Sequence, residues 1–509
     1  MDKIIVLDFG GQYCHLISRR IRDFGVYSEV LRSSTTKAEL EKIEDLRGLI
    51  LSGGAASVYD KSSPKCGKEI LDIGVPILGI CYGHQLIAFL EKGEVQSGGS
   101  GEYGITELKL SGADSSILNG LEKKERVWMN HKDIVKKLPV GYNSIASTEH
   151  SPVAAYENQD KDIYGVQFHP EVTHTLHGNE ILRNFVIDVC KAKKGWDTSN
   201  IISNIIQEAR ETMSGKKAVI GLSGGVDSST AAVMVSEAIG KDLTAVYVDT
   251  GLMRYKETEF IEKTFSKFDL DLKVIHAKER FFKALKGAVE PEEKRKIIGK
   301  LFIDIFEEEA KKVGADFLIQ GTIYSDRIES GITEHAANIK SHHNVGGLPA
   351  KMKLKLYEPL RDLYKDEVRK MALELGLPEE IITRHVFPGP GLAVRILGEV
   401  TPERAEITRT AGYIVEEELK KAGLYDKLWM GFAVLLPIKS VGIQGDARSY
   451  KYPVVVRIIE SKDAMTANFY KMPYEVLEAI STRITNEIPQ VNRVVYDISN
   501  KPPATMEWE

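Results

Sequence analysis

Short apolar runs alternate with helical patterns in the first third of the chain. Three such runs, residues 3–7, 48–51 and 75–80, end in turn residues or lead into a helical spacing. Buried strands that alternate with helices predict a parallel, doubly wound sheet with functional residues at the carboxyl ends of its strands. From residue 94 to 168 the pattern becomes strand-rich, and a helix is expected over residues 179–192.

A second alternation begins with an apolar run at residues 218–222 and continues to a long helical pattern at 291–313 and a strand at 317–320. This predicts a second doubly wound sheet. Residues 195–199 are interpreted as the linker between the two sheets. Residues 324–356 show no clean period, as expected of a functional lid or a disordered loop.

The character of the sequence changes again after residue 387. Thr401 and Pro402 form a helix start, with Thr as N-cap and Pro at the first helical position. Strands at 432–436, 454–459 and 493–498 and a helix at 474–487 predict a small α+β domain. The predicted class is therefore α/β, with two doubly wound, mainly parallel sheet domains (1–195 and 196–384) and a small C-terminal α+β domain (385–509).

The length, net charge and cysteine content of the chain exclude several classes of protein. A chain of 509 residues is too long for one hydrophobic core, and a net charge of −5 gives no basic field for nonspecific nucleic-acid binding. The four cysteines form no C-x-x-C pair, the N-terminus lacks a secretory apolar segment, and no apolar run has the length of a membrane span. We expect a cytoplasmic protein.

The first candidate site centres on Cys81, in Gly-Ile-Cys-Tyr-Gly at residues 79–83. It follows a predicted strand and precedes a predicted helix, which is the nucleophile-elbow arrangement with Cys in place of Ser. The helix N-terminus favours the thiolate that attacks carbonyls. His169 and Glu171, at the end of a later strand, supply a base and a group that orients it. Taken alone, the motif is equally compatible with a buried structural cysteine.

Other histidines have simpler interpretations. We expect structural roles for His84, His131 and His150. His174 and His177 have a spacing that could ligate a metal on a helix, but no further ligand pattern lies nearby. Residues 99–104 match the dinucleotide-binding spacing, yet they precede an alternating strand rather than a helix, so this match is rejected or assigned to a loop of the first candidate site.

Gly-Ile-Cys-Tyr-Gly-His-Gln, with a later Gln-Phe-His-Pro-Glu-Val, resembles the class I glutamine amidotransferases over residues 1–195. The resemblance implies that Cys81 attacks the glutamine carboxamide, His169 relays protons and Glu171 orients His169. It also implies an oxyanion hole from the backbone N–H groups of Gly54 and Tyr82. Many relatives have Pro after Ser-Gly-Gly where this chain has Ala55, which should leave the Gly54 N–H in place.

The second candidate site is Ser-Gly-Gly-Val-Asp-Ser-Ser at residues 223–229, between a strand and a helix. Glycines, hydroxyls and a helix N-terminus bind anions, and Asp227 is placed to hold Mg²⁺. A plain Gly/Ser turn is the alternative. No Walker A motif is present, and the loop resembles that of the N-type ATP-pyrophosphatases. The resemblance implies ATP binding by Ser223, Gly224, Gly225, Val226, Asp227, Ser228 and Ser229, with adenine contacts from Val248 and Leu252.

Three later blocks narrow the substrate. Residues 387–395, 441–446 and 501–509 resemble signatures of the GMP synthase family, although a linker and a stiff tail are the plainer interpretations of the first and last. The resemblance implies a homodimer formed through the C-terminal domain, and the substrates glutamine, MgATP and xanthosine monophosphate (XMP). It implies an XMP pocket of Arg295, Asp326, Pro388, Gly389, Gly391, Gln444, Arg493, Lys501, Thr505 and Glu507.

Two rival hypotheses remain at this point. The first is a pyrophosphatase of another substrate class, one that thiolates tRNA or forms NAD, which should lack the three later blocks. The second is a regulatory or scaffold protein on an inactive amidotransferase fold, which should lack a member of the triad; Cys81, His169 and Glu171 are all present.

Overall fold

A computed structural model describes the chain except for residues 113–114, 325, 327–353 and 462–465. The described residues form two compact units, Met1–Ile201 and Ile202–Glu509. The α/β class predicted from the sequence is confirmed. No helix in the described part of the chain is both long enough and apolar enough to cross a bilayer.

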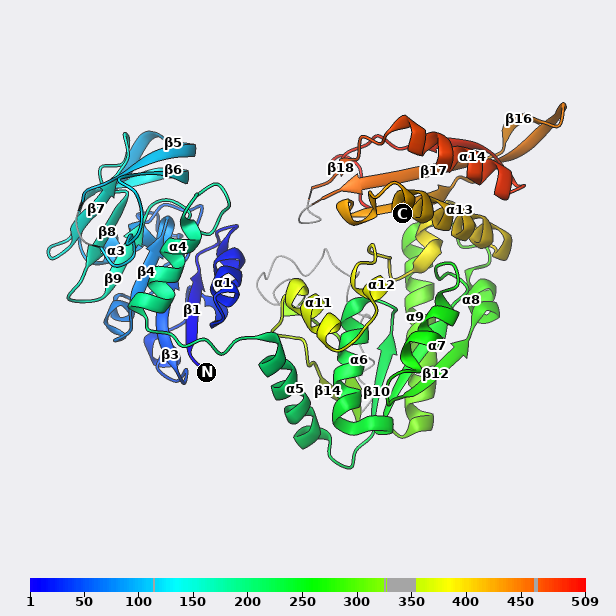
Figure 1. Cartoon of the computed structure of the whole chain (residues 1–509), viewed down its shortest axis with the longest axis horizontal. Coiled ribbons are helices and arrows are strands. Elements are labelled where there is room, and N and C mark those ends of the chain that lie inside the picture. Colours follow the sequence, from blue (N-terminus) through cyan, green and yellow to red (C-terminus); the bar gives the residue numbers. More distant parts are fainter. Residues whose placement is uncertain (113–114, 325, 327–353, 462–465) are drawn as a thin grey trace. The chain divides into compact units, whose positions relative to one another are not determined.

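The first unit is built on a nine-stranded sheet of order β2-β1-β3-β4-β9-β8-β7-β5-β6 (Figure 1). Strands β2, β1, β3, β4 and β9 run parallel, and the others extend the sheet antiparallel. The strands are β1 (Lys3–Asp8), β2 (Tyr27–Arg32), β3 (Leu46–Leu51), β4 (Ile77–Ile80), β5 (Glu94–Leu110), β6 (Lys124–Lys137), β7 (Asn143–Ser147), β8 (Ala155–Asn158) and β9 (Ile163–Val166).

Both faces of this sheet are covered, which explains why the middle residues of β1, from Ile4 to Leu7, are apolar on both sides of the strand. Ile4 and Val6 of β1 pack in one core with Ile17 of α1 (Cys14–Asp23), whereas Ile5 and Leu7 pack in a second core with Leu86 of α3 (Tyr82–Leu90). The remaining helices are α2 (Lys37–Leu40) and α4 (Gly178–Arg183), the latter continued by a π-helical turn at Asn184–Val189.

The second unit contains a five-stranded parallel sheet of order β12-β11-β10-β13-β14. Val219 and Val246 pack against Ile305 of α9 (Pro291–Val313), so the alternate residues of β10 face the other side of the sheet. The strands are β10 (Ala218–Leu222), β11 (Leu243–Asp249), β12 (Asp271–His276), β13 (Phe317–Ile319) and β14 (Lys355–Tyr357). The helices are α5 (Thr198–Met213), α6 (Val226–Ile239), α7 (Glu257–Phe265), α8 (Lys278–Leu285), α9, α11 (Lys365–Glu374) and α12 (Glu379–Ile382).

A smaller sheet in the same unit surrounds the long strand β17 (Ala447–Glu460). It pairs antiparallel with β15 (Met430–Leu435), β16 (Ser440–Gln444) and β18 (Asn468–Phe469), and parallel with β19 (Val491–Tyr496). Helices α13 (Pro402–Lys421) and α14 (Tyr474–Glu487) pack on one another and on this sheet. The predicted helix start is confirmed, since the Thr401 side chain accepts a hydrogen bond from Arg404 N at 3.2 Å.

The predicted linker at residues 195–199 needs a correction. The indole of Trp196 packs on Tyr27 with ring centroids 4.8 Å apart, and α5 begins at Thr198. The division at 384/385 stays a prediction, because the structure gives residues Ile202–Glu509 as one compact unit. Most of the predicted lid, residues 324–356, lies outside the described residues.

Candidate functional site

Three neighbouring strands of the first sheet bring the predicted glutamine-site residues together. β3 pairs with β4 and β4 pairs with β9, all parallel, so their carboxyl ends meet at one edge. Residues 52–54 follow β3, Cys81 follows β4, and His169 lies three residues beyond β9. A Cβ placed on Gly53 would lie 3.6 Å from Cys81 Cβ and 3.1 Å from His169 Cε1, so the three segments converge around this glycine.

Cys81 lies in a strained turn between β4 and α3. Its φ is 54° and its ψ is −104°, values that are costly for a residue with a side chain. Two glycines permit this turn: a Cβ on Gly79 would lie 2.6 Å from the Gly83 backbone, and one on Gly83 would lie 2.2 Å from Leu51 O. Hydrogen bonds from Cys81 N to Val166 O (2.8 Å) and from Gln85 N to Cys81 O (3.2 Å) hold it in place.

His169 and Glu171 form a buried pair, with Nδ1 of His169 2.7 Å from Oε1 of Glu171. Burial alone lowers the pKa of His169, but the interactions of the ring with Glu171 and Cys81 outweigh it and raise that pKa. His169 Nε2 has no hydrogen-bond partner among the described residues, which leaves it available to the thiol or to a substrate. The Cys81 thiol donates to Asn130 O at 3.8 Å.

The predicted oxyanion donors lie on either side of the cysteine. The Tyr82 N–H is the first of α3 and has no acceptor within the helix. A Cβ on Gly54 would lie 3.3 Å from the Tyr82 ring and 2.6 Å from Phe9 O, so Gly54 packs directly against the start of α3. Their role stays a prediction.

A loop that sequence reasoning did not single out fixes His169. Thr175 Oγ1 donates to His169 O at 2.6 Å and accepts from Trp128 N at 3.1 Å, and His169 N donates to Trp128 O at 3.0 Å. The loop therefore ties the base to β6. Thr175 lies six residues after His169 in an irregular segment, and no sequence period marks it.

Four other histidines contact neighbouring side chains. His177 Nδ1 lies 2.7 Å from Glu125 Oε2, and His174 stacks on Trp128 at 4.6 Å. His131 contacts Glu102, and the fully buried His84 stacks on Tyr156. Across the described ranges, no cluster of three or more His, Cys, Asp or Glu side chains could hold a metal. Residues 99–104 lie inside β5, so the strand–loop–helix context of a dinucleotide site is missing there.

The second candidate site follows β10. Gly224 has a φ of 75°, which a side chain disfavours, and Gly225 is the N-cap of α6. The serine hydroxyls fold the loop: Ser223 Oγ lies 3.0 Å from Ser228 Oγ, and Ser229 Oγ donates to Gly225 O at 2.8 Å. The loop thus presents backbone N–H groups and hydroxyls at a helix N-terminus, an arrangement that binds phosphates.

Asp227 lies in the first turn of α6 and pairs with a lysine that the sequence reading missed. Its Oδ2 accepts from Lys365 Nζ at 2.5 Å, and its buried Oδ1 has no hydrogen-bond partner among the described residues. Lys365 begins α11, 138 residues away, so no local motif marks it. A buried, unsatisfied carboxylate oxygen beside a phosphate-binding loop fits a site for Mg²⁺.

The predicted adenine contacts follow the neighbouring strand β11. Val248 and Leu252 are almost completely buried, so a nucleotide would reach their backbone groups rather than their side chains. Leu252 O accepts from Leu392 N at 2.8 Å. Gly391, with φ of 64°, approaches so closely that a Cβ there would lie 2.4 Å from Leu252 O. Gly391 N also closes a turn onto Pro388 O at 2.8 Å, with Gly389 inside that turn.

The C-terminal tail brings several predicted XMP residues together. Arg395 donates two hydrogen bonds to the Glu507 carboxylate, at 2.8 and 3.0 Å. Arg295 of α9 donates to Glu509 O, and Arg457 donates to Thr505 O at 2.7 Å. The tail is therefore held by two buried arginines, Arg395 and Arg457, and by the half-buried Arg295. Asp326 lies beyond β13, where its Oδ2 accepts from Ile323 N at 3.1 Å.

Predicted XMP residues on β16 and β19 lie far from Lys501, at the start of the tail. Arg493 pairs with Pro453 in the middle of β17, whereas Lys501 bridges to Ala467 beside the C-terminal end of that strand. The seven steps from Pro453 to Glu460 span roughly 23 Å at strand spacing. Gln444 is farther still, on β16, and its side chain lies outside the described ones. On the same chain, the two groups of predicted XMP residues are therefore well separated along β17.

Comparisons with known proteins agree with this division of sites. The family model for class-I glutamine amidotransferase matches residues 5–189, that for NAD synthase matches 198–299, and that for the GMP synthase C-terminal domain matches 417–508. A glutamine-hydrolysing GMP synthase of Aquifex aeolicus is 52% identical over 507 residues, covering 99% of each chain. Those of Caldanaerobacter subterraneus and Symbiobacterium thermophilum are each 51% identical over 100% of this chain and 99% of theirs.

A nucleophile elbow with a cysteine–histidine–glutamate triad, followed by a pyrophosphate loop on a parallel sheet, defines a class I glutamine amidotransferase fused to an ATP-pyrophosphatase. The identity along the full length is more specific than either domain. The chain belongs to the family of glutamine-hydrolysing GMP synthases.

Proposed function

We propose that this protein is a glutamine-dependent GMP synthase, which hydrolyses glutamine to ammonia, adenylates XMP with ATP, and aminates adenyl-XMP to GMP and AMP. The observation that carries the proposal is the convergence of Cys81 and the His169–Glu171 pair at one sheet edge, on a chain related over its full length to such ligases. The three later sequence blocks separate it from other pyrophosphatases.

At the first site Cys81 would attack the glutamine carboxamide as a thiolate. The raised pKa of His169 keeps its imidazolium beside that thiolate, and the imidazolium can then protonate the departing ammonia. Glu171 holds the ring through Nδ1, which leaves Nε2 for the reaction. The tetrahedral oxyanion would lie against the N–H groups of Gly54 and Tyr82, and water would release glutamate from the thioester.

At the second site the loop of residues 223–229 would hold the phosphates of ATP. The C2 oxygen of XMP attacks the α-phosphorus, the bond to pyrophosphate breaks, and ammonia then displaces AMP from adenyl-XMP. Asp227 would hold Mg²⁺, which neutralises charge on the pyrophosphate as it leaves. Lys365, 2.5 Å from Asp227, brings a positive charge to the same place.

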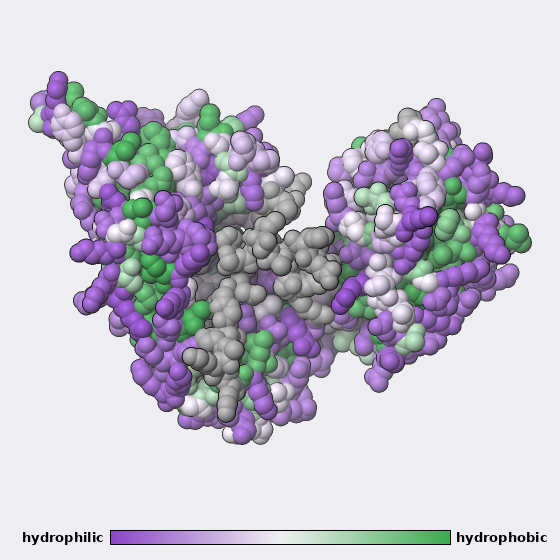
Figure 2. Space-filling model, turned by 180° about the vertical axis from the view of Figure 1, so that it is seen from behind, coloured by the Kyte–Doolittle hydropathy of each residue, from purple (hydrophilic) through white to green (hydrophobic). Residues whose placement is uncertain are grey.

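We further propose a homodimer through the C-terminal domain, with 385–509 as that domain. Gln444 and Arg493 could complete an XMP pocket if a second copy supplied them, because they lie far from Lys501 on their own chain. The β16 arm (Ser440–Gln444 and the start of β17) carries exposed hydrophobic side chains, since Val441 is 52% and Ile443 76% exposed. Figure 2 shows this arm projecting at the upper left, with hydrophobic patches among hydrophilic ones.

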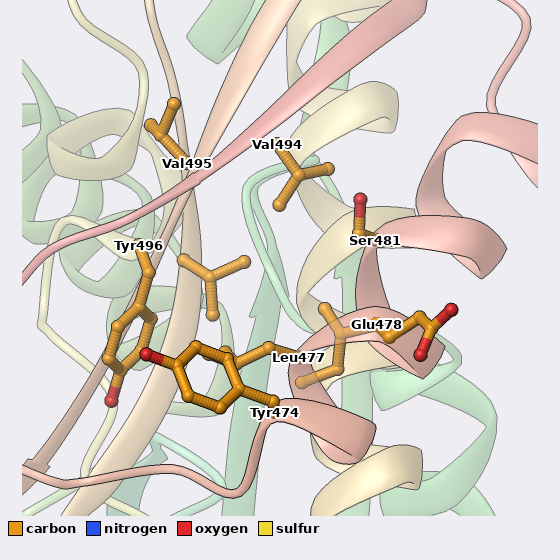
Figure 3. A pocket seen from close by; sticks show the side chains of 9 residues that line it. Tyr474, Leu477, Glu478, Ser481, Val494, Val495 and Tyr496 are labelled. Atoms are coloured by element: carbon orange, nitrogen blue, oxygen red, sulfur yellow. The ribbon is translucent and has the colours of Figure 1, made fainter.

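A nearby apolar pocket also suits an interface. It has a volume of about 440 Å³ and lies between α14 and β19, where Figure 3 shows the rings of Tyr474 and Tyr496 beside one another and Glu478 and Ser481 at the far end. Tyr474 is 86% exposed. A cytoplasmic location fits the four free, buried cysteines.

The substrate assignment is tested by AMP release from MgATP and ammonium with XMP, deamido-NAD or tRNA as acceptor. The proposal predicts AMP and GMP in equal amounts with XMP, and no AMP above background with the other two. AMP formation with deamido-NAD or tRNA, or none with XMP, would contradict it.

A further inference from the structure

The turn after β11 is held by the C-terminal part of the unit. Asp249 Oδ1 accepts from Gly251 N at 3.0 Å and Thr250 Oγ1 accepts from Leu252 N at 3.2 Å, which closes the turn internally. The carbonyl of Leu252 bonds to another segment of the chain, because Leu252 O accepts a hydrogen bond from Leu392 N at 2.8 Å. The shape of this turn therefore depends on residues more than 100 positions away.

Arg409 of α13 binds the two carbonyls that flank Leu252. Its Nε donates to Met253 O at 3.0 Å and its Nη2 donates to Gly251 O. The third side of the guanidinium donates to Glu406 Oε2, one turn earlier on the same helix. The Arg409 side chain is only 17% exposed, so these bonds form largely away from water.

The arrangement of these two carbonyls fits a guanidinium group better than an ammonium group. Two carbonyls that are two residues apart in a tight turn are matched by donors at fixed spacing on a planar fork, whereas a lysine ammonium is a single point on a flexible stem. Gly251, with φ of 76°, turns its carbonyl toward α13. A lysine at position 409 would keep the charge and lose the simultaneous contact with both carbonyls.

We propose that Arg409 is a positioning residue for ATP, through which the C-terminal domain sets the backbone of residues 249–253. The inference rests on the proposed function and on the predicted adenine contacts, the backbone of Val248 and Leu252. Arg409 itself need not touch the nucleotide. Because Arg409 bonds to the carbonyls of Gly251 and Met253 in the ATP turn and to no predicted XMP residue, its loss should change ATP binding more than XMP binding.

The test compares Arg409→Lys and Arg409→Gln with the wild-type chain. We expect both to raise the ATP KM of the ammonia-dependent reaction and the Kd of MgATP by calorimetry about 10- to 100-fold, as for the loss of a charge-assisted hydrogen bond. The XMP KM and the glutaminase kcat should stay within about twofold. Arg483→Lys is the matched control, since Arg483 also anchors α13, through Glu417 and Glu418, without contacting the turn.

An ATP KM and a MgATP Kd within twofold of wild type in both Arg409 variants would overturn the inference. Equal rises in the KM of ATP and XMP, or the same rise in Arg483→Lys, would also overturn it, because they would indicate general loosening of α13. Thermal unfolding identifies a variant that fails to fold. If Arg409→Lys fails to fold, the ATP KM and MgATP Kd of the neutral variant Arg409→Gln decide the test. If wild type binds MgATP but does not use XMP, only the proposed substrate fails; if it binds no MgATP, both fail.

Discussion

At the scale of single residues, the backbone of Cys81 shows how the nucleophile is positioned. A residue with a side chain at φ of 54° and ψ of −104° stores about 1–3 kcal/mol of strain, which persists only when its surroundings fix it. Here the surroundings are the close backbone approaches at Gly79 and Gly83 and the hydrogen bond from Cys81 N to Val166 O. The strained turn holds the buried Cys81 beside Gly53, which His169 also approaches.

Glu171→Gln should shift the pH profile of the glutaminase. The carboxylate helps raise the pKa of His169, so its loss should move the alkaline limb of the profile to lower pH and reduce kcat about 10²–10⁴-fold. The pKa of His169 is higher in the folded protein than its unfolded value of about 6.5, so the charged His169 stabilises the fold below that pH. This stabilisation is lost as the pH rises through the folded pKa. Glutaminase rates across pH measure the shift. An unchanged alkaline limb would contradict the role of Glu171.

Asp227→Asn should abolish AMP formation with either nitrogen source. Its buried Oδ1 has no partner in the described part of the chain, and an amide cannot replace a carboxylate as a ligand of Mg²⁺ on pyrophosphate. Glutaminase activity should persist, because it belongs to the other unit. Asp242→Asn, at an exposed position just beyond α6, is the control. Near-normal ammonia-dependent turnover of Asp227→Asn at saturating Mg²⁺ would refute the assignment.

At the scale of elements, the antiparallel β5–β6 pair is stabilised by a buried polar cluster. Glu102 accepts hydrogen bonds from Thr148 Oγ1 (2.7 Å) and Ser151 Oγ (2.8 Å), and His131 Nε2 lies 3.2 Å away. Burial alone raises the pKa of Glu102, but these partners outweigh it and lower the pKa to about 2. The cluster joins β5 and β6 to the loop after β7. Strand β6 is also the strand that carries Asn130.

Glu102→Ala should destabilise the first unit by about 3–5 kcal/mol, because it leaves buried partners unpaired. Glu107→Ala on the same strand should cost less than about 1 kcal/mol, since Glu107 and its partner Lys124 are exposed. Because the folded pKa of Glu102 is depressed, its stabilisation is present above pH of about 4.3 and is lost as the pH falls toward 2. Urea titration of both variants checks this. Equal stabilities would show that the cluster does not stabilise the unit.

Helices and strands with a complete hydrophobic period could be predicted from the sequence, whereas irregular or exposed segments could not. The predicted bounds of β10, α9 and α14 are confirmed by the structure. Helix α5 was missed although Ile201, Ala209 and Met213 are buried at helical spacing, because the nearby Gly195 suggested a linker. The β16 arm was missed for a physical reason: it is exposed, so no alternation with a core marks it.

At the scale of the whole molecule, sequence order predicts which segments carry chemistry but not how far apart they fold. Cys81 and His169 are 88 positions apart, yet the order β3-β4-β9 makes them neighbours. Lys501 and Arg493 are only eight positions apart, yet Arg493 lies beside the middle of β17 and Lys501 beside its C-terminal end. The partners Lys365 and Arg409 come from segments without a motif. Pairings of this kind are set by the tertiary fold alone.

The central claim is that one chain carries two separable reactions, and Cys81→Ala tests it most directly. The measurement is GMP formation from XMP and MgATP, first with glutamine and then with high ammonium at alkaline pH, where free ammonia is plentiful. We predict no GMP with glutamine and a rate near wild type with ammonium, because only the glutaminase needs the thiolate. GMP formation with glutamine would show that Cys81 is not the nucleophile. Failure with ammonium in a folded variant would contradict the two-site account.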